Sequence, residues 1–277
     1  MLSLDDLSAS CPNPFLQHLK SRFAFFAIHG VKTKQLACYA ENDIVCATIA
    51  NEGGWEDWFI RMMMQYQTPG VHFIDIGANV GSFTMKMAER GPVTAFEIMP
   101  PNLALLHLSR CQASPSVNIT FLPFGLSDAT RSCVLVSHVT NAGDGAVRCD
   151  LPLDFVEQNG YRNRGVLHMK RLDDVFPRGL PYPSIIKIDV EGHEPAVMVG
   201  ASASLTGPRR PNVIFSEVWK LIDVPKYVEM VRGYGYIPYW VDNNNLELST
   251  PESVVKMHKE MSAIQNILFK RTDLKVR

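Results

Sequence analysis

Short apolar runs alternate with segments of helical periodicity from Val71 to the end of the chain. Alternation of this kind is typical of a parallel sheet that is covered by helices on both faces. The pattern predicts an α/β fold with a doubly wound, mostly parallel sheet of seven strands, the last two forming a terminal hairpin. We expect the strands at residues 71–76, 93–96, 117–121, 184–190, 212–218, 236–241 and 264–269, and the helices at 82–89, 101–111, 194–205 and 225–232.

Residues 1–70 lack this alternation and are expected to form an N-terminal cap of helix and hairpin. Two apolar runs, 35–40 and 44–49, flank the polar residues Glu41-Asn42-Asp43, and this pattern predicts a hairpin. Apolar positions at helical spacing predict a helix over 58–66.

Residues 127–170 interrupt the strand–helix alternation of the main domain, which we place at 71–277. Their irregular pattern includes β-type pieces such as 133–139. We therefore expect a β-rich insertion in the main domain.

Composition narrows the class of protein. The chain has 277 residues, of which 46% are apolar and 20% charged, a balance typical of a globular enzyme rather than a disordered chain. The formal net charge is -1, so no overall positive field would attract nucleic acid or an anionic membrane. We expect neither a nucleic-acid partner nor a membrane-spanning segment.

The cysteines and the N-terminus suggest a location. Six cysteines are scattered without a Cys-x-x-Cys pair, and we interpret them as buried free thiols in a reducing compartment. Residues 1–6 are acidic, unlike a signal peptide, and the apolar run 23–28 is too short to cross a bilayer. These features predict a cytoplasmic protein.

A glycine-rich turn follows the first strand of the main domain, with the sequence Asp75-Ile-Gly77-Ala78-Asn79-Val-Gly81 and Ser82 at the start of the next helix. Glycines allow a sharp turn and a close approach to a ligand, and a helix N-terminus offers free N–H groups to an anion. The spacing departs from the G-x-G-x-x-G of dinucleotide binders. It suits S-adenosylmethionine, whose ammonium group would find an acceptor in Asp75. Alternatively, the turn only links a strand to a helix.

Glu97 ends the second strand, 22 positions after Asp75. A carboxylate at this place and spacing can accept hydrogen bonds from both hydroxyls of a ribose. An isolated acid at a strand end would more often be a solvated surface residue. Together with the glycine turn, Glu97 favours an adenosine-containing ligand.

Acidic residues also gather at the ends of the fourth and fifth strands. Asp189, Glu191 and His193 follow the fourth strand, and Glu217 lies at the end of the fifth, so all four are candidates for a general base. The three carboxylates could alternatively hold a divalent cation. Lys187 lies inside the fourth strand and either pairs with Asp189 or extends past the sheet edge.

The residues after the fourth strand also bear on the nucleophile. Methyltransferases that act on nucleic-acid amines usually carry Asn/Asp-Pro-Pro-aromatic at this place, whereas this chain has Asp-Val-Glu-Gly at 189–192. The difference favours an oxygen nucleophile.

Taken together, these motifs resemble the FkbM family of methyltransferases. The resemblance runs from about Gly53 to Phe269 and is most specific at the end of the fourth strand. Its segments are 73–81, Phe96-Glu97 with Pro100 and Asn102, Leu126-Ser127-Asp128, Leu172-Asp173-Asp174 and 186–192.

The resemblance implies a Rossmann-like class I methyltransferase fold and O-methylation of a hydroxyl on a small molecule, sugar or lipid-like substrate, with S-adenosylmethionine as donor. Ser127 and Asp128 would lie near the adenine. Glu56 would either reach the pocket or cap a helix. His193 departs from the small residue common in the family, as Ile98 departs from its proline. By position, the donor would be held by Glu56, Asp75, Gly77, Ala78, Asn79, Gly81, Ser82, Glu97, Ser127 and Asp128.

Two other functions remain open at this point. One is a protein that binds the donor without transferring a methyl group. The other is a nicotinamide-dependent oxidoreductase, which the missing third glycine of the dinucleotide motif disfavours. The residues do not predict the acceptor or the oligomeric state.

Overall fold

The fold is given by a computed structural model of the chain. Residues 1–22, on which the expectation about a signal peptide rests, lie outside the described part. The structure describes residues 23–26, 36–114, 116–141, 143, 145–152, 160–219, 222–241, 248, 250–260 and 265–273.

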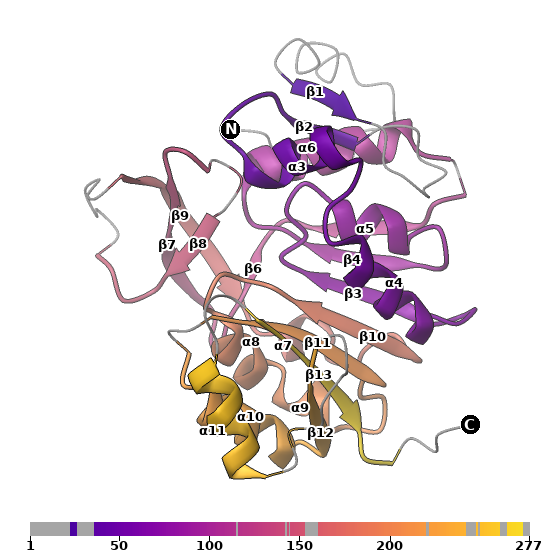
Figure 1. Cartoon of the computed structure of the whole chain (residues 1–277), viewed down its shortest axis with the longest axis vertical. Helices are drawn as coiled ribbons and strands as arrows, with labels where there is room; N and C mark the ends of the chain where they lie inside the picture. Colours follow the sequence, from indigo (N-terminus) through magenta and orange to yellow (C-terminus); the bar gives the residue numbers. More distant parts are fainter. Residues whose placement is uncertain are drawn as a thin grey trace.

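A seven-stranded sheet crosses the centre of the molecule in the order β12-β13-β11-β10-β3-β4-β5 (Figure 1). β13 runs antiparallel to both of its neighbours, and the other contacts in the sheet are parallel. The predicted doubly wound, mostly parallel sheet is thus confirmed. Its strands are β3 (His72–Ile76), β4 (Val93–Phe96), β5 (Ile119–Leu122), β10 (Ser184–Ile188), β11 (Val213–Val218), β12 (Tyr236–Trp240) and β13 (Gln265–Arg271).

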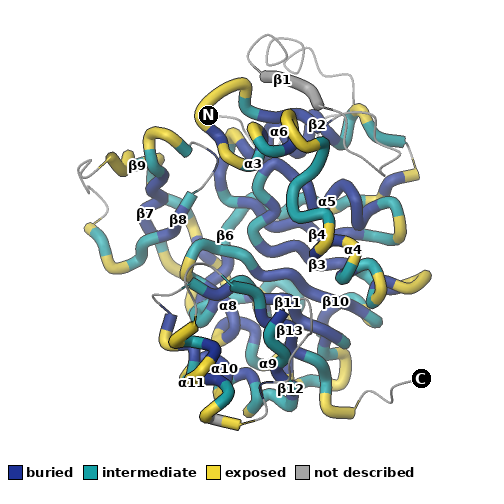
Figure 2. Tube along the Cα trace, in the orientation of Figure 1, coloured by how far each residue is buried: buried dark blue, intermediate teal, exposed yellow. Residues whose placement is uncertain are grey.

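Each central strand contributes alternate residues to two separate cores, because successive side chains of a strand point to opposite faces. Phe73 belongs to one core and Ile74 to the other. Figure 2 shows these strands mostly in the colour of buried residues. α4 (Asp57–Tyr66), α5 (Ser82–Met87) and α6 (Pro100–Gln112) cover the face of Phe73, whereas α7 (Leu172–Val175), α8 (Glu194–Gly200), α9 (Ser202–Thr206), α10 (Val224–Gly233) and α11 (Pro251–Glu260) cover the other.

The predicted hairpin in the N-terminal region is wrong. β2 (Leu36–Tyr39) instead pairs antiparallel with β1 (Phe23–Phe26), and the second run forms the helix α3 (Ile44–Glu52). The reason is Asp43, whose Oδ1 accepts a hydrogen bond of 2.8 Å from the backbone N–H of Cys46. A residue that can turn a hairpin can also cap a helix, and here the cap prevails.

A second sheet lies in the segment for which we expected a β-rich insertion, in the order β6-β9-β7-β8. In Figure 1, β7, β8 and β9 project to the left of the main sheet. The strands are β6 (Gly125–Leu126), β7 (Arg131–His138), β8 (Gly145–Arg148) and β9 (Tyr161–Lys170).

The expectation of free thiols is wrong for part of the cysteines. A disulfide joins Cys133 to Cys149 across the β7–β8 hairpin, and Cys111 is also disulfide-bonded. The register pairs Val134 with Arg148, so the residues next to them face one another. Cys38 and Cys46 are buried free thiols, as expected.

Within the described ranges, no helix is both long enough and apolar enough to cross a bilayer.

Candidate functional site

The glycine turn after β3 is held by hydrogen bonds within the protein. Gly77 has φ +87°, and a Cβ there would collide with the carbonyl oxygen of Asp189, so this position requires glycine. The backbone N–H groups of Gly77 and Ala78 donate to the Phe96 carbonyl at 3.0 and 2.9 Å. The N–H of Asn79 donates to Glu97 Oε2 at 2.7 Å. The N–H groups of these three residues are therefore already bonded within the protein. They cannot bind an anion as we expected from the sequence.

Glu97 lies at the end of β4 and is buried beside the turn. Besides the bond from Asn79, it accepts one at Oε1 from the N–H of Met99, at 2.7 Å. Burial raises the pKa of Glu97 to about 7, although these backbone donors favour the charged form and lower it. Glu97 can thus change its charge near neutral pH.

A first cavity opens in front of Glu97. It lies between the glycine turn, the ends of β4 and β10, the start of α6 and the insertion. Its lining includes Ile76, Gly77, Asn79, Phe96, Glu97, Ile98, Met99, Asn102, Phe124, Gly125, Leu126, Gly143, Gly145, Val147, Met169, Asp189, Val190, Glu191 and His193.

A second cavity lies on the other side of the turn. It shares Gly77, Asn79, Asp189 and Glu191 with the first, so the two cavities meet at the ends of β3 and β10. Its remaining lining combines acids, two indoles and one lysine, as well as apolar groups: Ile44, Val45, Trp55, Glu56, Ala78, Val80, Ser82, Phe83, Asn141, Lys187, Glu217 and Trp219.

Lys187 is buried in β10 and pairs with carboxylates, as one of the two sequence interpretations predicts. Its Nζ lies 2.8 Å from Asp189 Oδ2 and 3.9 Å from Asp75 Oδ1. The ammonium also lies over the Phe83 ring, 4.6 Å from its centroid. The neighbouring carboxylates outweigh the effect of burial and raise the pKa of Lys187 above its ordinary value, so it stays charged.

Asp75 has no exposed surface and lines neither cavity. Its Oδ2 accepts a hydrogen bond of 2.6 Å from the Thr84 hydroxyl. Asp75 thus lies beneath the turn and connects Lys187 of β10 to Thr84 of α5.

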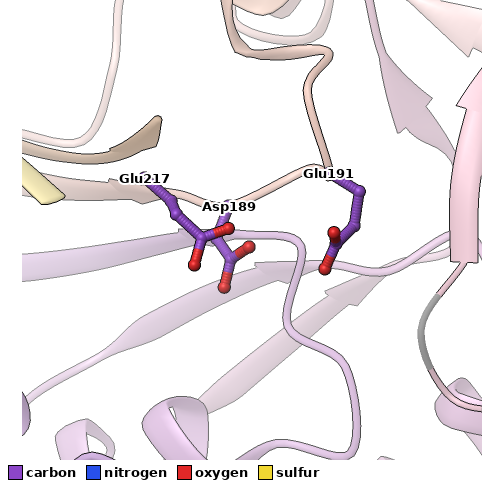
Figure 3. A group of neighbouring side chains, drawn as sticks. All are labelled: Asp189, Glu191 and Glu217. Atoms are coloured by element: carbon purple, nitrogen blue, oxygen red, sulfur yellow. The ribbon is translucent and has the colours of Figure 1, made fainter. Parts of the chain in front are cut away.

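Asp189, Glu191 and Glu217 form a cluster of carboxylates at the meeting point of the cavities (Figure 3). One oxygen from each lies within 4.8 Å of the others. Glu217 Oε2 accepts a hydrogen bond from Trp219 Nε1 at 3.1 Å. Burial, followed by the charge of Asp189, raises the pKa of Glu217 well above its ordinary value.

The cluster only partly fits a divalent cation. Three carboxylates are ligands that a hard cation prefers. However, the ammonium of Lys187 already pairs with Asp189, and the raised pKa of Glu217 disfavours the charged form that would bind a metal. A cation would therefore have to displace charges that the protein itself supplies.

Three residues of the two cavities have left-handed backbone conformations that are unusual for residues other than glycine. These are Glu56 with φ 48°, Asn79 with φ 50° and Glu191 with φ 56°. Such conformations are costly and tend to occur at functional sites. Glu56 makes no capping hydrogen bond with its side chain at the start of α4, so of its two predicted roles the structure favours the pocket.

His193 and Ser127 lie together beside the first cavity. His193 lines the first cavity only, and its Nε2 lies 3.0 Å from Ser127 Oγ. Burial lowers the pKa of His193, so its ring is neutral at pH 7. Ser127 is fully buried behind it, and Asp128 pairs with Arg131 outside both cavities.

The structure brings most of the predicted residues to the two cavities and leaves the others behind them. Sequence reasoning missed the part played by Met99, Gly143 and Trp219, which line the cavities from the start of α6, the insertion and the end of β11. Asn102 was noticed only through the family resemblance. The sole signal for Gly143 was its place in a glycine-containing turn.

The strand order, the antiparallel strand β13 and a cleft at the carboxyl ends of β3, β4 and β10 define the Rossmann-like fold of class I methyltransferases. The model of the methyltransferase FkbM domain matches residues 75–238, which is more than half of the chain. The chain therefore belongs to the FkbM methyltransferase family. No curated protein matches it.

Several solved structures resemble the chain at low identity. Methyltransferase FkbM from Methylobacillus flagellatus KT is 16% identical over 73% of this chain, with a TM-score of 0.43, and the chain spans only 44% of that protein. The TehB-like SAM-dependent methyltransferase from Corynebacterium glutamicum is 9% identical, with 81% and 93% of the two chains covered and a TM-score of 0.42. Magnesium protoporphyrin IX methyltransferase from Synechocystis PCC 6803, with bound SAM, is 12% identical, with 78% of this chain and 77% of that protein covered and a TM-score of 0.41.

Proposed function

We propose that this protein is an S-adenosylmethionine-dependent O-methyltransferase that acts on a hydroxyl of a small molecule, sugar or lipid-like substrate. One observation carries the proposal: two cavities meet at Asp189 and Glu191, one lined by a buried carboxylate suited to a ribose and the other by carboxylates and indoles. Such a pair of cavities suits a donor and an acceptor that react where the cavities join.

The first cavity suits the adenosyl part of the donor. Each oxygen of Glu97 accepts one backbone N–H and keeps a lone pair with which to accept a ribose hydroxyl. His193 is available to the adenine, because its neutral ring borders the cavity and Ser127 fixes its orientation from behind.

The amino-acid end of the donor would extend along the glycine turn into the second cavity. Ser82 lines this cavity, and its hydroxyl is buried without a hydrogen-bond partner among the described residues. An unsatisfied buried hydroxyl is costly, and a donor carboxylate would satisfy it. Asp75 would then act indirectly, by holding Lys187 and α5 in place.

When bound, S-adenosylmethionine supplies a methyl group on a positively charged sulfur. Within the carboxylate cluster, Asp189 is the proposed base, because it lines both cavities and is the partner of Lys187. It would accept the proton of the acceptor hydroxyl as that oxygen bonds to the methyl carbon and the electrons of the carbon–sulfur bond return to sulfur. Lys187 then supplies the positive charge that a metal ion would otherwise bring.

The test begins with calorimetric titration of the protein with S-adenosylhomocysteine. We expect binding, and no binding at millimolar concentration would contradict the proposal. Transfer is then followed with radiolabelled donor and an extract of the source cells. Asp189→Asn is expected to lower turnover roughly 100-fold or more while donor affinity stays within about threefold.

Glu217→Gln is the matched control, because it makes the same acid-to-amide change in the same cluster at a residue that lines only the second cavity, and it should keep most of the activity. Equal losses in the two variants would refute the choice of base. A chelator in the same assay should leave turnover unchanged, and loss of activity would indicate a metal instead. Donor binding without any labelled product would favour a binding protein, and a fluorescence titration with NADH tests the oxidoreductase.

A further inference from the structure

The N-terminal region, the main domain and the insertion meet at one buried side chain, that of Asn102 in the first turn of α6. The Tyr39 hydroxyl, at the end of β2, donates to Asn102 Oδ1 at 2.7 Å. Asn102 Nδ2 donates to the carbonyl oxygen of Gly143 in the insertion at 2.9 Å. Asn102 is 1% exposed, so these bonds are shielded from water.

The same amide lies beside the ribose-facing carboxylate. Asn102 Nδ2 lies 3.8 Å from Met99 Sδ, and the nearby amide favours the charged form of Glu97 and lowers its pKa. The backbone N–H of Met99, three positions earlier on the chain, also donates to Glu97. The orientation and charge of Glu97 therefore depend on where the first turn of α6 holds its polar groups.

Gly143 lies at the place where the insertion reaches the first cavity. It lines that cavity, together with Gly145 and Val147 of the same hairpin. Gly143 is buried, and a Cβ there would collide with Asp43 Oδ2 and lie 3.0 Å from the Tyr39 ring. This close packing fixes the distance between the insertion and the N-terminal region.

We propose that Asn102, held by Tyr39, is a positioning residue for donor binding: it fixes Glu97 and keeps the insertion against the ribose side of the first cavity. The inference rests on the proposed function, because it takes Glu97 to bind the donor's ribose. The residue has to be an amide. Its oxygen accepts from a hydroxyl and its nitrogen donates to a carbonyl, and an aspartate there would bring a second negative charge close to Glu97.

Two variants test the inference: Tyr39→Phe, which removes one hydroxyl, and Asn102→Asp, which keeps the shape of the side chain and changes its charge. Tyr39→Phe removes only the hydroxyl that donates to Asn102 and should raise the Kd for S-adenosylhomocysteine about fivefold, whereas Asn102→Asp should raise it roughly tenfold or more. Tyr66→Phe is the matched control. It also removes one tyrosine hydroxyl, but Tyr66 packs against Phe215 and lines neither cavity, so its Kd should not change.

A second readout separates positioning from general stability. The wild-type protein should bind S-adenosylhomocysteine more tightly than its 2′-deoxy analogue, by about tenfold, because the analogue has lost one hydrogen bond to a carboxylate. If Asn102 positions Glu97, this ratio should fall towards one in Tyr39→Phe and Asn102→Asp. If Asn102 only stabilised the fold, the substitutions would lower the unfolding temperature. The folded fraction would then keep the wild-type ratio of the two affinities.

The possible failures are distinguishable. If the wild-type protein binds S-adenosylhomocysteine and prefers it to the deoxy analogue, but Tyr39→Phe does so equally, the positioning role is refuted and the proposed function stands. If the wild-type protein binds neither compound, or binds both equally, the ribose assignment of Glu97 fails and the inference fails with it. Should Asn102→Asp not fold, Tyr39→Phe alone decides.

Discussion

Single residues of the site combine burial with charge, and this combination sets how they respond to pH. Glu97, Glu194 and Glu217 are buried carboxyl groups whose pKa values are all raised, mainly by burial. Lys187 is buried as well, yet its carboxylate neighbours keep it charged. The site and its surroundings therefore combine acids of raised pKa with a lysine that stays charged.

Donor binding should weaken as the pH falls through about 7. The pKa of Glu97 is raised to about 7, so below this pH the group carries a proton and accepts ribose hydroxyls less well. If binding requires the charged form, the Kd for S-adenosylhomocysteine should rise roughly tenfold between pH 8 and pH 6. Calorimetry across this range measures the effect.

Glu97→Gln separates this effect from that of Glu194, whose pKa is also about 7 but which lines neither cavity. The variant should bind more weakly at pH 8 and lose most of the dependence on pH. An unchanged pH profile in Glu97→Gln would assign the titration to another group.

At the scale of elements, the sequence predicted most strands and helices, because their apolar periodicity reflects burial on the two faces of the sheet. The prediction failed where one polar residue can favour either of two local structures. Asp43 could turn a hairpin or cap a helix, and the choice depends on β1, which occupies the pairing edge of β2. The helix expected over 194–205 is likewise divided at Ala201 into α8 and α9.

The β7–β8 hairpin gives a prediction at this scale. The disulfide between Cys133 and Cys149 closes the hairpin, and Val147 of β8 packs against Met99 and Cys133 at the first cavity. Replacing both cysteines by serine should lower the free energy of unfolding by about 3 kcal/mol, as expected for a loop of 16 residues. Donor affinity should fall about threefold or more, because part of the cavity wall loses its tether.

Chemical denaturation and calorimetry, with and without reductant, measure the two effects. Reductant should weaken donor binding in the wild-type protein and add little in the double serine variant. Equal sensitivity in both proteins would point to the other bonded cysteine, Cys111, instead.

At the scale of the whole molecule, the first cavity depends on three parts of the chain that lie far apart in sequence. A ligand bound there contacts the main domain and the insertion, and the insertion is tied to the N-terminal region through Asn102. S-adenosylhomocysteine at 100 times its Kd should stabilise the native state by about 2.7 kcal/mol and raise the unfolding temperature by about 5 °C. Scanning calorimetry tests this, and an unchanged midpoint would contradict binding to the native state.

This arrangement also explains how far the sequence could predict the site. Asp189, Glu191 and Glu97 follow strands of one parallel sheet, whose carboxyl ends meet at one edge, so local pattern is enough to bring them together. Contacts such as Tyr39 with Asn102 depend on how separate parts pack, and no local periodicity encodes that. Local periodicity does not encode the disulfide between Cys133 and Cys149 either. Its presence removes the argument that the cysteines, as free thiols, indicate a reducing, cytoplasmic location.

The bond between Cys133 and Cys149 has a practical consequence for obtaining active protein. Sulfur–sulfur bonds rarely form in a bacterial cytosol, where thioredoxin and glutathione keep cysteines in the thiol form. Material produced there would carry an untethered hairpin and bind the donor more weakly, and a screen for acceptors would then underestimate activity for reasons unrelated to the acceptor's chemistry. Secretion into the periplasm, or a host strain with an oxidising cytosol, is the appropriate source of enzyme for any such screen.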